Sequence, residues 1–202
     1  KWWSLLDILP VSNNGLKTDR DDLFFDFEKK SLDTRMRLFF RPELPSYFAE
    51  QYRIKDSSSY DIEARRKESS FDAKAIRKCL YRPFDFRWLY YDIGLTSRPA
   101  EKVMKHLLAG DNIALCCLRQ SRRGETGAYL AANCLVNKDV VSLFDIGTVF
   151  PLYLNTNGNL PDEDLFAHDN GRRPNLSAEF IKDFCDALQV KFVPGGLGRP
   201  GK

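Results

Sequence analysis

The residues best suited to contacting a ligand lie between two apolar stretches, in residues 118–127 (LRQSRRGETG). An arginine side chain pairs bidentately with O6 and N7 of guanine, and a glutamine side chain pairs in the same way with adenine. Further arginines and hydroxyl groups suit phosphate oxygens. The segment therefore predicts DNA contacts, although a solvated hairpin tip would explain the same composition equally well. The residues concerned are Arg119, Gln120, Ser121, Arg122 and Arg123.

Four basic residues elsewhere are further candidates for phosphate contacts. Lys17 and Arg20 lie in a polar turn, where they could also serve only solubility. Arg98 precedes a predicted helix, whose free amides attract phosphate, but a capping or salt-bridging role is open as well. Lys138 lies in the tripeptide Asn-Lys-Asp, which we interpret as a turn with side chains free for contact. The predicted DNA-binding set is thus Lys17, Arg20, Arg98, Lys138 and the five residues of 119–123.

Catalytic and metal-binding signatures are not found in the sequence. It has no glycine-rich phosphate loop, no HExxH and no GxSxG, and it lacks the Asn/Asp-Pro-Pro-aromatic tetrapeptide of amino-methyltransferases. His106 and His168 have no metal-ligand spacing, and the five cysteines include no CxxC pair. We expect neither catalysis nor metal binding. The cysteines indicate reduced thiols in a cytoplasmic protein, and no apolar run approaches the roughly 18 residues of a membrane span.

An aromatic segment, residues 79–92 (CLYRPFDFRWLYYD), is expected to organise the fold. Its second half, 86–91, predicts a buried strand that seeds the core. A helix is expected before it, beginning after Asp72 as N-cap and ended by Pro83. Within this segment, Arg82 and Arg87 are expected to pair internally, with Asp85 or Asp92, rather than with DNA.

The remaining elements follow from apolar patterning and turn signals. Residues 5–11 and 23–27 suggest a strand–turn–strand opening, and Ser31 could cap a helix that ends at Phe40. Residues 42–60 are turn-rich, 61–70 indicate an exposed helix or a mobile insert, and 155–174 predict a long loop. Further strands are predicted over 113–118, 129–136 and 148–154, and helices over 100–109 and 178–188, the last capped by Ser177. These elements indicate a mixed α/β (α+β) fold with a central mixed sheet and flanking helices.

Taken in order, several segments match a known family. They are SNNGLKTDRDDLFFDF, IRKCLYRPFDFRWLYYD, SRPAEKVMKHLL, NIALCCLRQ, GTVFPLYLN and RRPNLSAEFI, which together span about residues 8–190. The chain resembles the C-terminal specificity domain of Type ISP restriction-modification enzymes, bacterial proteins that combine nuclease, helicase-like ATPase and adenine methyltransferase modules. The fold is therefore expected to be like that of a target-recognition domain. In the family, the loops corresponding to 119–127 and 137–147 vary with the target sequence.

The resemblance implies a domain that binds double-stranded DNA and directs adenine-N6 methylation, with cleavage as a further activity of such enzymes, in defence against foreign DNA. The chain is then expected to be a non-catalytic piece of a longer DNA methyltransferase, in contact with methyltransferase and helicase modules of the same polypeptide. No cofactor is expected in these residues, and S-adenosylmethionine would bind the missing methyltransferase domain. We expect one target-recognition domain over 1–190, with 42–70 as an insertion and 191–202 as a flexible tail. The alternative is a structural domain that docks on the methyltransferase or helicase through Trp2, Trp3 and Leu5 without reading bases.

Overall fold

The strands form two four-stranded sheets and one two-stranded sheet. The computed structural model describes residues 2–118, 128–143, 145, 147–155 and 172–193. The first sheet has the order β2-β4-β3-β7 and the second the order β1-β8-β5-β6. The first is mixed, because β7 runs parallel to β3 while its other pairs are antiparallel. The second is antiparallel throughout, and β9 pairs with β10.

The bounds of the strands are as follows. The first sheet contains β2 (Phe25–Asp26), β3 (Ile76–Arg82), β4 (Asp85–Tyr90) and β7 (Leu135–Val136). The second contains β1 (Asn13–Asn14), β5 (Ala114–Leu118), β6 (Tyr129–Ala132) and β8 (Gly147–Pro151). The short pair is β9 (Tyr153–Asn155) and β10 (Arg172–Pro174).

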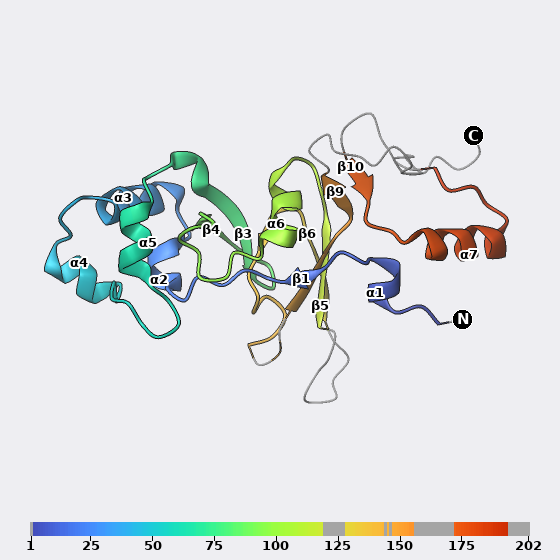
Figure 1. Cartoon of the computed structure of the whole chain (residues 1–202), viewed down its shortest axis with the longest axis horizontal. Helices are drawn as coiled ribbons and strands as arrows, with labels where there is room; N and C mark the ends of the chain where they lie inside the picture. The colour runs from blue at the N-terminus through green and yellow to red at the C-terminus, as the bar shows by residue number, and fades with distance from the viewer. Residues whose placement is uncertain (1, 119–127, 144, 146, 156–171, 194–202) are drawn as a thin grey trace.

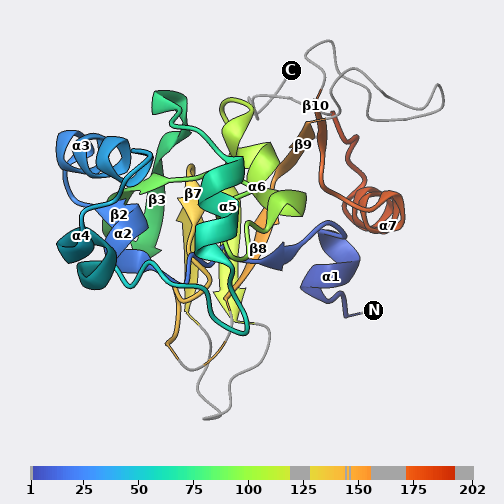
Figure 2. The same ribbon diagram turned by 60° about the vertical axis from the view of Figure 1, so that its left-hand side comes forward.

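The helices gather in groups around the sheets (Figure 1). On one side lie α2 (Asp21–Phe24), α3 (Lys29–Phe39), α4 (Ser46–Gln51) and α5 (Ile62–Glu68). At the opposite end lie α1 (Leu5–Ile8) and α7 (Ala178–Leu188), and α6 (Glu101–Leu108) lies beside the second sheet (Figure 2). No helix among the described residues is long and apolar enough to cross a bilayer.

One apolar core joins both sheets to the helices. Leu32, Met36 and Phe39 of α3 are fully buried, and their spacing places them on one helical face. The same cluster contains Leu89 of β4 and Cys116 of β5. Because one core connects the two sheets, the ends of their strands hold fixed positions relative to each other.

Several sequence predictions are confirmed. The mixed α/β class is correct, and the apolar strand β5 lies inside the second sheet. The aromatic strand is β4, but of its residues only Leu89 and Tyr90 are buried, and Phe86 is exposed. The helix predicted over 100–109 is α6. Residues 178–188 form α7, and the Ser177 side chain accepts a hydrogen bond from the Phe180 amide as the predicted N-cap.

The helix predicted after Asp72 is wrong. The Asp72 side chain does cap, by accepting from the Lys74 amide, but only one 3-10 turn (Ala73–Ala75) follows before the chain becomes strand β3. The apolar residues of β3 mimic helical spacing, yet the strand pairs with β4 along its length. Pairing with a neighbouring strand overrides local preference here.

Other element boundaries also differ from the predictions. Residues 5–8 form helix α1 with a Ser4–Asp7 capping box, and 21–24 form helix α2, so the opening is not strand–turn–strand. Helix α3 begins at Lys29, before the predicted cap Ser31. The strand predicted over 129–136 splits into β6 and β7, which belong to different sheets, and 148–154 splits into β8 and β9. Within the predicted loop 155–174, residues 172–174 form strand β10, and 156–171 lie outside the described residues.

Residues 42–70 carry helices α4 and α5 and contribute Phe48, Tyr60 and Ile62 to the buried core. The exposed helix predicted in 61–70 is thus α5, anchored by Ile62. The division into a domain over 1–190 with an insertion at 42–70 and a tail at 191–202 stays a prediction.

Candidate nucleic-acid interface

A backbone junction brings three of the predicted phosphate-binding residues together. The amide of Leu16 donates to the carbonyl of Val136, and the amide of Lys138 donates to the carbonyl of Leu16, each at 2.9 Å. Lys17 and Arg98 exchange amide-to-carbonyl hydrogen bonds, also at 2.9 Å. Lys17, Arg98 and Lys138, far apart in the sequence, therefore lie in one small region, which we call the basic junction.

The basic junction requires a glycine at position 15. A Cβ atom there would lie 2.6 Å from the carbonyl carbon of Asn137 and 2.6 Å from the amide nitrogen of Lys138. Real side chains do not approach a backbone that closely, so only glycine lets the two segments meet. The Gly15 amide in turn donates to the carbonyl of Gly147 at 3.2 Å.

Strand β8 of the second sheet connects the basic junction to the end of β5, after which the predicted base-contacting residues 119–123 follow in the sequence. The Gly147 amide donates to the Lys138 carbonyl at 3.0 Å, and Gly147 pairs with Leu118 at the end of β5. Leu118, the last described residue before 119–127, therefore lies close to the basic junction. The predicted readers Arg119, Gln120, Ser121, Arg122 and Arg123 lie outside the described residues.

Carboxylates accompany the cations of the basic junction. Lys17 forms an ion pair with Asp19, which also accepts a hydrogen bond from the Ser97 hydroxyl. Burial raises the pKa of Asp19, but Lys17, Ser97 and the charge of Arg98 outweigh it and hold the pKa below its ordinary value. Lys138 pairs with Asp139 at 2.9 Å. Lys17 and Lys138, both partly exposed, are therefore held in place before any ligand arrives.

The side chains of Asn137 and Arg20 both form hydrogen bonds within the protein. The Asn137 side chain is not free for contact, because it is buried and its Oδ1 accepts from the Asp139 amide and from Arg82. The Arg20 guanidinium donates to three backbone carbonyls, those of Asp19, Arg53 and Lys55, and thus fastens the segment after α4. Its contact with phosphate stays a prediction.

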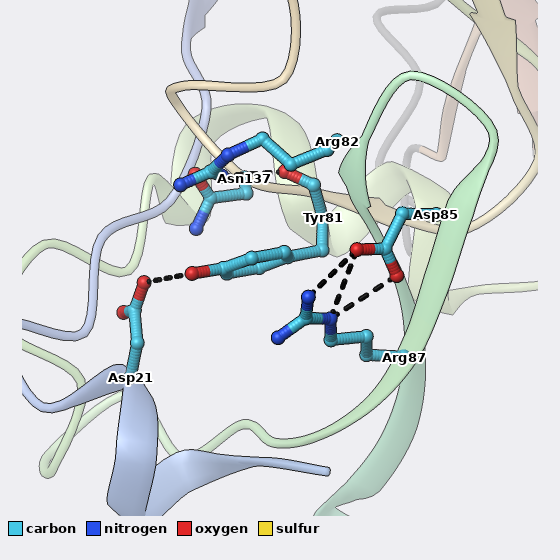
Figure 3. Close-up of polar contacts among 6 residues, drawn as sticks. All are labelled: Asp21, Tyr81, Arg82, Asp85, Arg87 and Asn137. Atoms are coloured by element: carbon cyan, nitrogen blue, oxygen red, sulfur yellow. Dashed lines mark hydrogen bonds and ion pairs between the residues drawn. The ribbon is translucent and has the colours of Figure 1, made fainter. Parts of the chain in front are cut away.

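The end of the β3–β4 hairpin adds a second group of charges to the region (Figure 3). Arg82 lies over the Tyr81 ring at 4.0 Å and donates to Asn137 Oδ1 at 3.2 Å. Arg87 also lies 4.0 Å from that ring centre and forms a bidentate pair with Asp85. The internal pairing predicted for Arg87 is confirmed, whereas Arg82 pairs with an amide and a carbonyl instead of a carboxylate.

Tyr81 holds this hairpin against α2. Its hydroxyl donates to the Asp21 carboxylate at 2.8 Å (Figure 3). The other Asp21 oxygen accepts from the Thr18 hydroxyl. Burial, together with the Asp21 charge, raises the pKa of Tyr81 to about 12, so the hydroxyl remains a donor at neutral pH. Arg82 is fixed beside Asn137, the residue before Lys138, and sequence reasoning did not select it as a site residue. Only its position after Tyr81, on which it could stack, hinted at this role, because the parallel pairing of β3 with β7 is not readable from the sequence.

The described part of this region offers cations and donors suited to a polyanion. Lys17, Arg98 and Lys138 can approach phosphates, and Arg82 is an oriented guanidinium of the kind that contacts phosphates or guanine.

Comparison with known proteins agrees with this description. The family model of the Type ISP C-terminal specificity domain matches residues 7–195. No curated protein matches the sequence. Similar folds occur in a DrdV–DNA complex (TM-score 0.64, 18% identity), covering 90% of this chain and 18% of that chain. A nuclease-deletion mutant of the Type ISP restriction-modification enzyme LlaGI, in complex with a DNA substrate mimic, matches with a TM-score of 0.60 and 16% identity. The match covers 88% of this chain and 18% of that chain. The ATP-dependent Type ISP restriction-modification enzyme LlaBIII bound to DNA matches with a TM-score of 0.59 and 18% identity. The match covers 85% of this chain and 12% of that chain. The chain thus spans less than one fifth of each of these proteins.

Proposed function

Because the chain belongs to the Type ISP C-terminal specificity domain family, we propose that it recognises double-stranded DNA for a larger restriction-modification enzyme. Base contacts would come from residues 119–123, and Lys17, Arg98 and Lys138 would position the domain on phosphates. Such a division of labour is general, because phosphate contacts fix register while base contacts specify sequence. The family match favours this role over a purely structural docking domain.

The basic junction is the observation that carries the proposal. Backbone hydrogen bonds bring three cations from separate segments to the place where 119–127 begins. A net charge of only +3 would not attract DNA strongly if it were spread evenly. At the basic junction, Lys17 and Lys138 are each paired with a carboxylate and Arg98 is exposed, so phosphates of bound DNA would compete with Asp19 and Asp139 for two of the three cations.

The role of the parent enzyme is part of the same proposal. The three solved structures named above are DNA complexes, two of them of Type ISP enzymes. We propose that this domain directs adenine-N6 methylation in the cytoplasm by a methyltransferase module of the same polypeptide. That module, rather than residues 1–202, would bind S-adenosylmethionine.

The salt dependence of DNA binding tests the proposal. The chain is titrated into a labelled mixed-sequence duplex between about 50 and 200 mM salt, and log K is plotted against log salt. Replacing Lys17, Arg98 and Lys138 together by glutamine should weaken binding and flatten the slope by about 0.9 for each phosphate that the protein no longer neutralises.

A matched control removes the same charge elsewhere. Lys30, Lys67 and Lys182, which are exposed on α3, α5 and α7, are replaced together by glutamine, and the slope should then stay that of the unmodified chain. Affinity of the unmodified chain that hardly changes with salt would overturn the proposal, and equal slopes for the two triple variants would remove the basic junction from it.

A further inference from the structure

Phe84 occupies the turn of the β3–β4 hairpin in a conformation that suits glycine. Arg82 pairs with Asp85, so Pro83 and Phe84 are the two central residues of the turn. Phe84 has φ 63°. Proline followed by a residue of positive φ matches a type II turn, whose third position normally holds glycine or asparagine. A phenylalanine there is strained, and such strain concentrates at functional sites.

The Phe84 side chain gains little from the fold in return for this strain. Its exposed fraction is 86%. No ring or cation among the described residues stacks on it, in contrast to the exposed ring of Phe27, which lies under the Arg87 guanidinium at 4.4 Å. The ring therefore presents free apolar faces to solvent.

The residues around Phe84 make its position rigid and cationic. The Asp85–Arg87 pair fixes one strand of the hairpin, and Arg82, stacked on Tyr81, fixes the other. Because β7 runs parallel to β3, Asn137 follows β7 beside the end of β3, and its amide donates to the Leu80 carbonyl at 3.0 Å. The turn thus lies at the same end of the sheet as Lys138, and β3 and β5 run towards the same edge of the molecule in both views (Figures 1 and 2).

We propose that Phe84 is an aromatic wedge that stacks on a base face of the bound DNA, next to phosphates held by the basic junction. An apolar side chain that enters a base step unstacks it partly, and a ring that stacks on a base gains affinity whatever the base is. This inference rests on the proposed function and adds an apolar contact that is insensitive to salt. A surface ring used only for protein docking would leave DNA binding unaffected.

Two probes test the wedge with the full chain. One is a short labelled duplex, and the other is the same duplex with one central abasic site. Because a base is missing at that site, a side chain can insert there without unstacking one. Phe84→Ala should weaken binding to the intact duplex roughly 5- to 150-fold, the range measured for base–aromatic stacking, with the salt slope unchanged. The unmodified chain should prefer the abasic duplex, and Phe84→Ala should lose that preference.

Two further variants exclude trivial explanations. Phe184→Ala removes an exposed ring on α7, away from the hairpin, and should bind as the unmodified chain does. Phe84→Gly relieves the left-handed strain and should raise Tm while it weakens DNA binding, which separates the wedge from damage to the fold.

The outcomes distinguish the wedge from the proposed function. Salt-dependent binding of the unmodified chain together with unchanged affinity in Phe84→Ala overturns the wedge alone, and so does an abasic preference that survives the substitution. Absence of salt-dependent binding in the unmodified chain overturns the proposed function, and the wedge falls with it.

Discussion

Asp19 competes, within the protein, for the cation that DNA would use. It pairs with Lys17, accepts from Ser97 and is close enough to Arg98 for that charge to lower its pKa. The carboxylate organises Lys17, but its charge also repels phosphate. Its backbone is left-handed, with φ 58°, a conformation that asparagine tolerates well. An asparagine at this position therefore changes charge with little change in shape.

Asp19→Asn should raise DNA affinity and lower stability. Loss of the negative charge frees Lys17 for phosphate, whereas loss of charge-assisted hydrogen bonds should cost about 1–2 kcal/mol of unfolding free energy at neutral pH. Because the folded pKa of Asp19 is lowered, its contribution is present above the unfolded pKa near 3.8 and is lost as pH falls through the folded value. Denaturation at pH 7 and below pH 4 measures this, and a stability difference from the unmodified chain that stays constant across that interval would contradict the assignment.

At the scale of single residues, the candidate site residues can be predicted from the sequence, but the residues that they contact in the fold cannot. Arginines and lysines in polar segments are recognisable as candidates, and the Arg87–Asp85 pair is predictable because the two residues share one strand. Arg82 escapes selection as a site residue because its position beside Lys138 depends on Asn137, which lies in a distant segment. Contacts across the fold are not encoded in local spacing.

At the scale of elements, the close approach of β1 to the turn after β7 decides where the cations lie. Gly15 touches the backbone of Asn137 and Lys138, and its amide reaches Gly147 of β8. Segments that belong to different sheets therefore meet through backbone atoms alone.

Gly15→Ala should separate these segments. The added methyl group meets backbone atoms that cannot rotate away, so we expect a loss of about 2–3 kcal/mol of unfolding free energy, as for overpacked sites, and weaker DNA binding through displaced Lys17 and Lys138. Chemical denaturation and the duplex titration measure the two effects.

Gly94→Ala is the matched control for that substitution. A Cβ at Gly94 would meet only side-chain oxygens, of Asp92 at 3.2 Å and of Ser69 at 3.6 Å. It should cost clearly less than Gly15→Ala and leave DNA binding intact. Equal stability of the two alanine variants would show that the backbone of Asn137 and Lys138 moves away from position 15 at little cost in free energy.

Elements with a strong local pattern are predictable, and those defined by distant pairing are not. Helix α7 has both a cap and an amphipathic stripe, so its bounds follow from the sequence. The pattern of strand β3 resembles that of a helix, and only its partner β4 distinguishes the two. The apolar run 129–136 gives no sign that it crosses from one sheet to the other between β6 and β7.

At the scale of the whole molecule, one buried amide connects the two ends of the described chain. The side chain of Asn175 accepts from the Val11 amide at 3.0 Å and donates to the carbonyls of Val11 and Pro151 at 2.7 and 2.8 Å. Two further contacts join the same two segments: the Ser177 amide donates to the Ile8 carbonyl, and the Trp3 and Phe180 rings pack edge to face. None of the residues of α7, all of them described, is buried. Helix α1 is also attached by Leu5 and Ile8, which pack against a buried cluster of Leu9, Cys117 of β5 and Phe150 of β8. The attachment of α7, more than that of α1, therefore depends on Asn175.

Asn175→Ala should release α7 before the sheets unfold, whereas α1 keeps its apolar contacts with β5 and β8. Three backbone groups would lose a partner, the amide and carbonyl of partly exposed Val11 and the buried carbonyl of Pro151, at a cost of about 3 kcal/mol in total. The weakly packed α7 would bear most of this cost as local opening. Hydrogen exchange should speed up in α7 and around Val11 while β4 and β5 remain protected. Asn133→Ala, at an exposed turn residue, should leave all four unchanged. Equal acceleration in the sheets would show that Asn175 stabilises the fold as a unit. Under local opening of α7, DNA affinity should persist, because the basic junction and Phe84 lie on the sheets that stay closed.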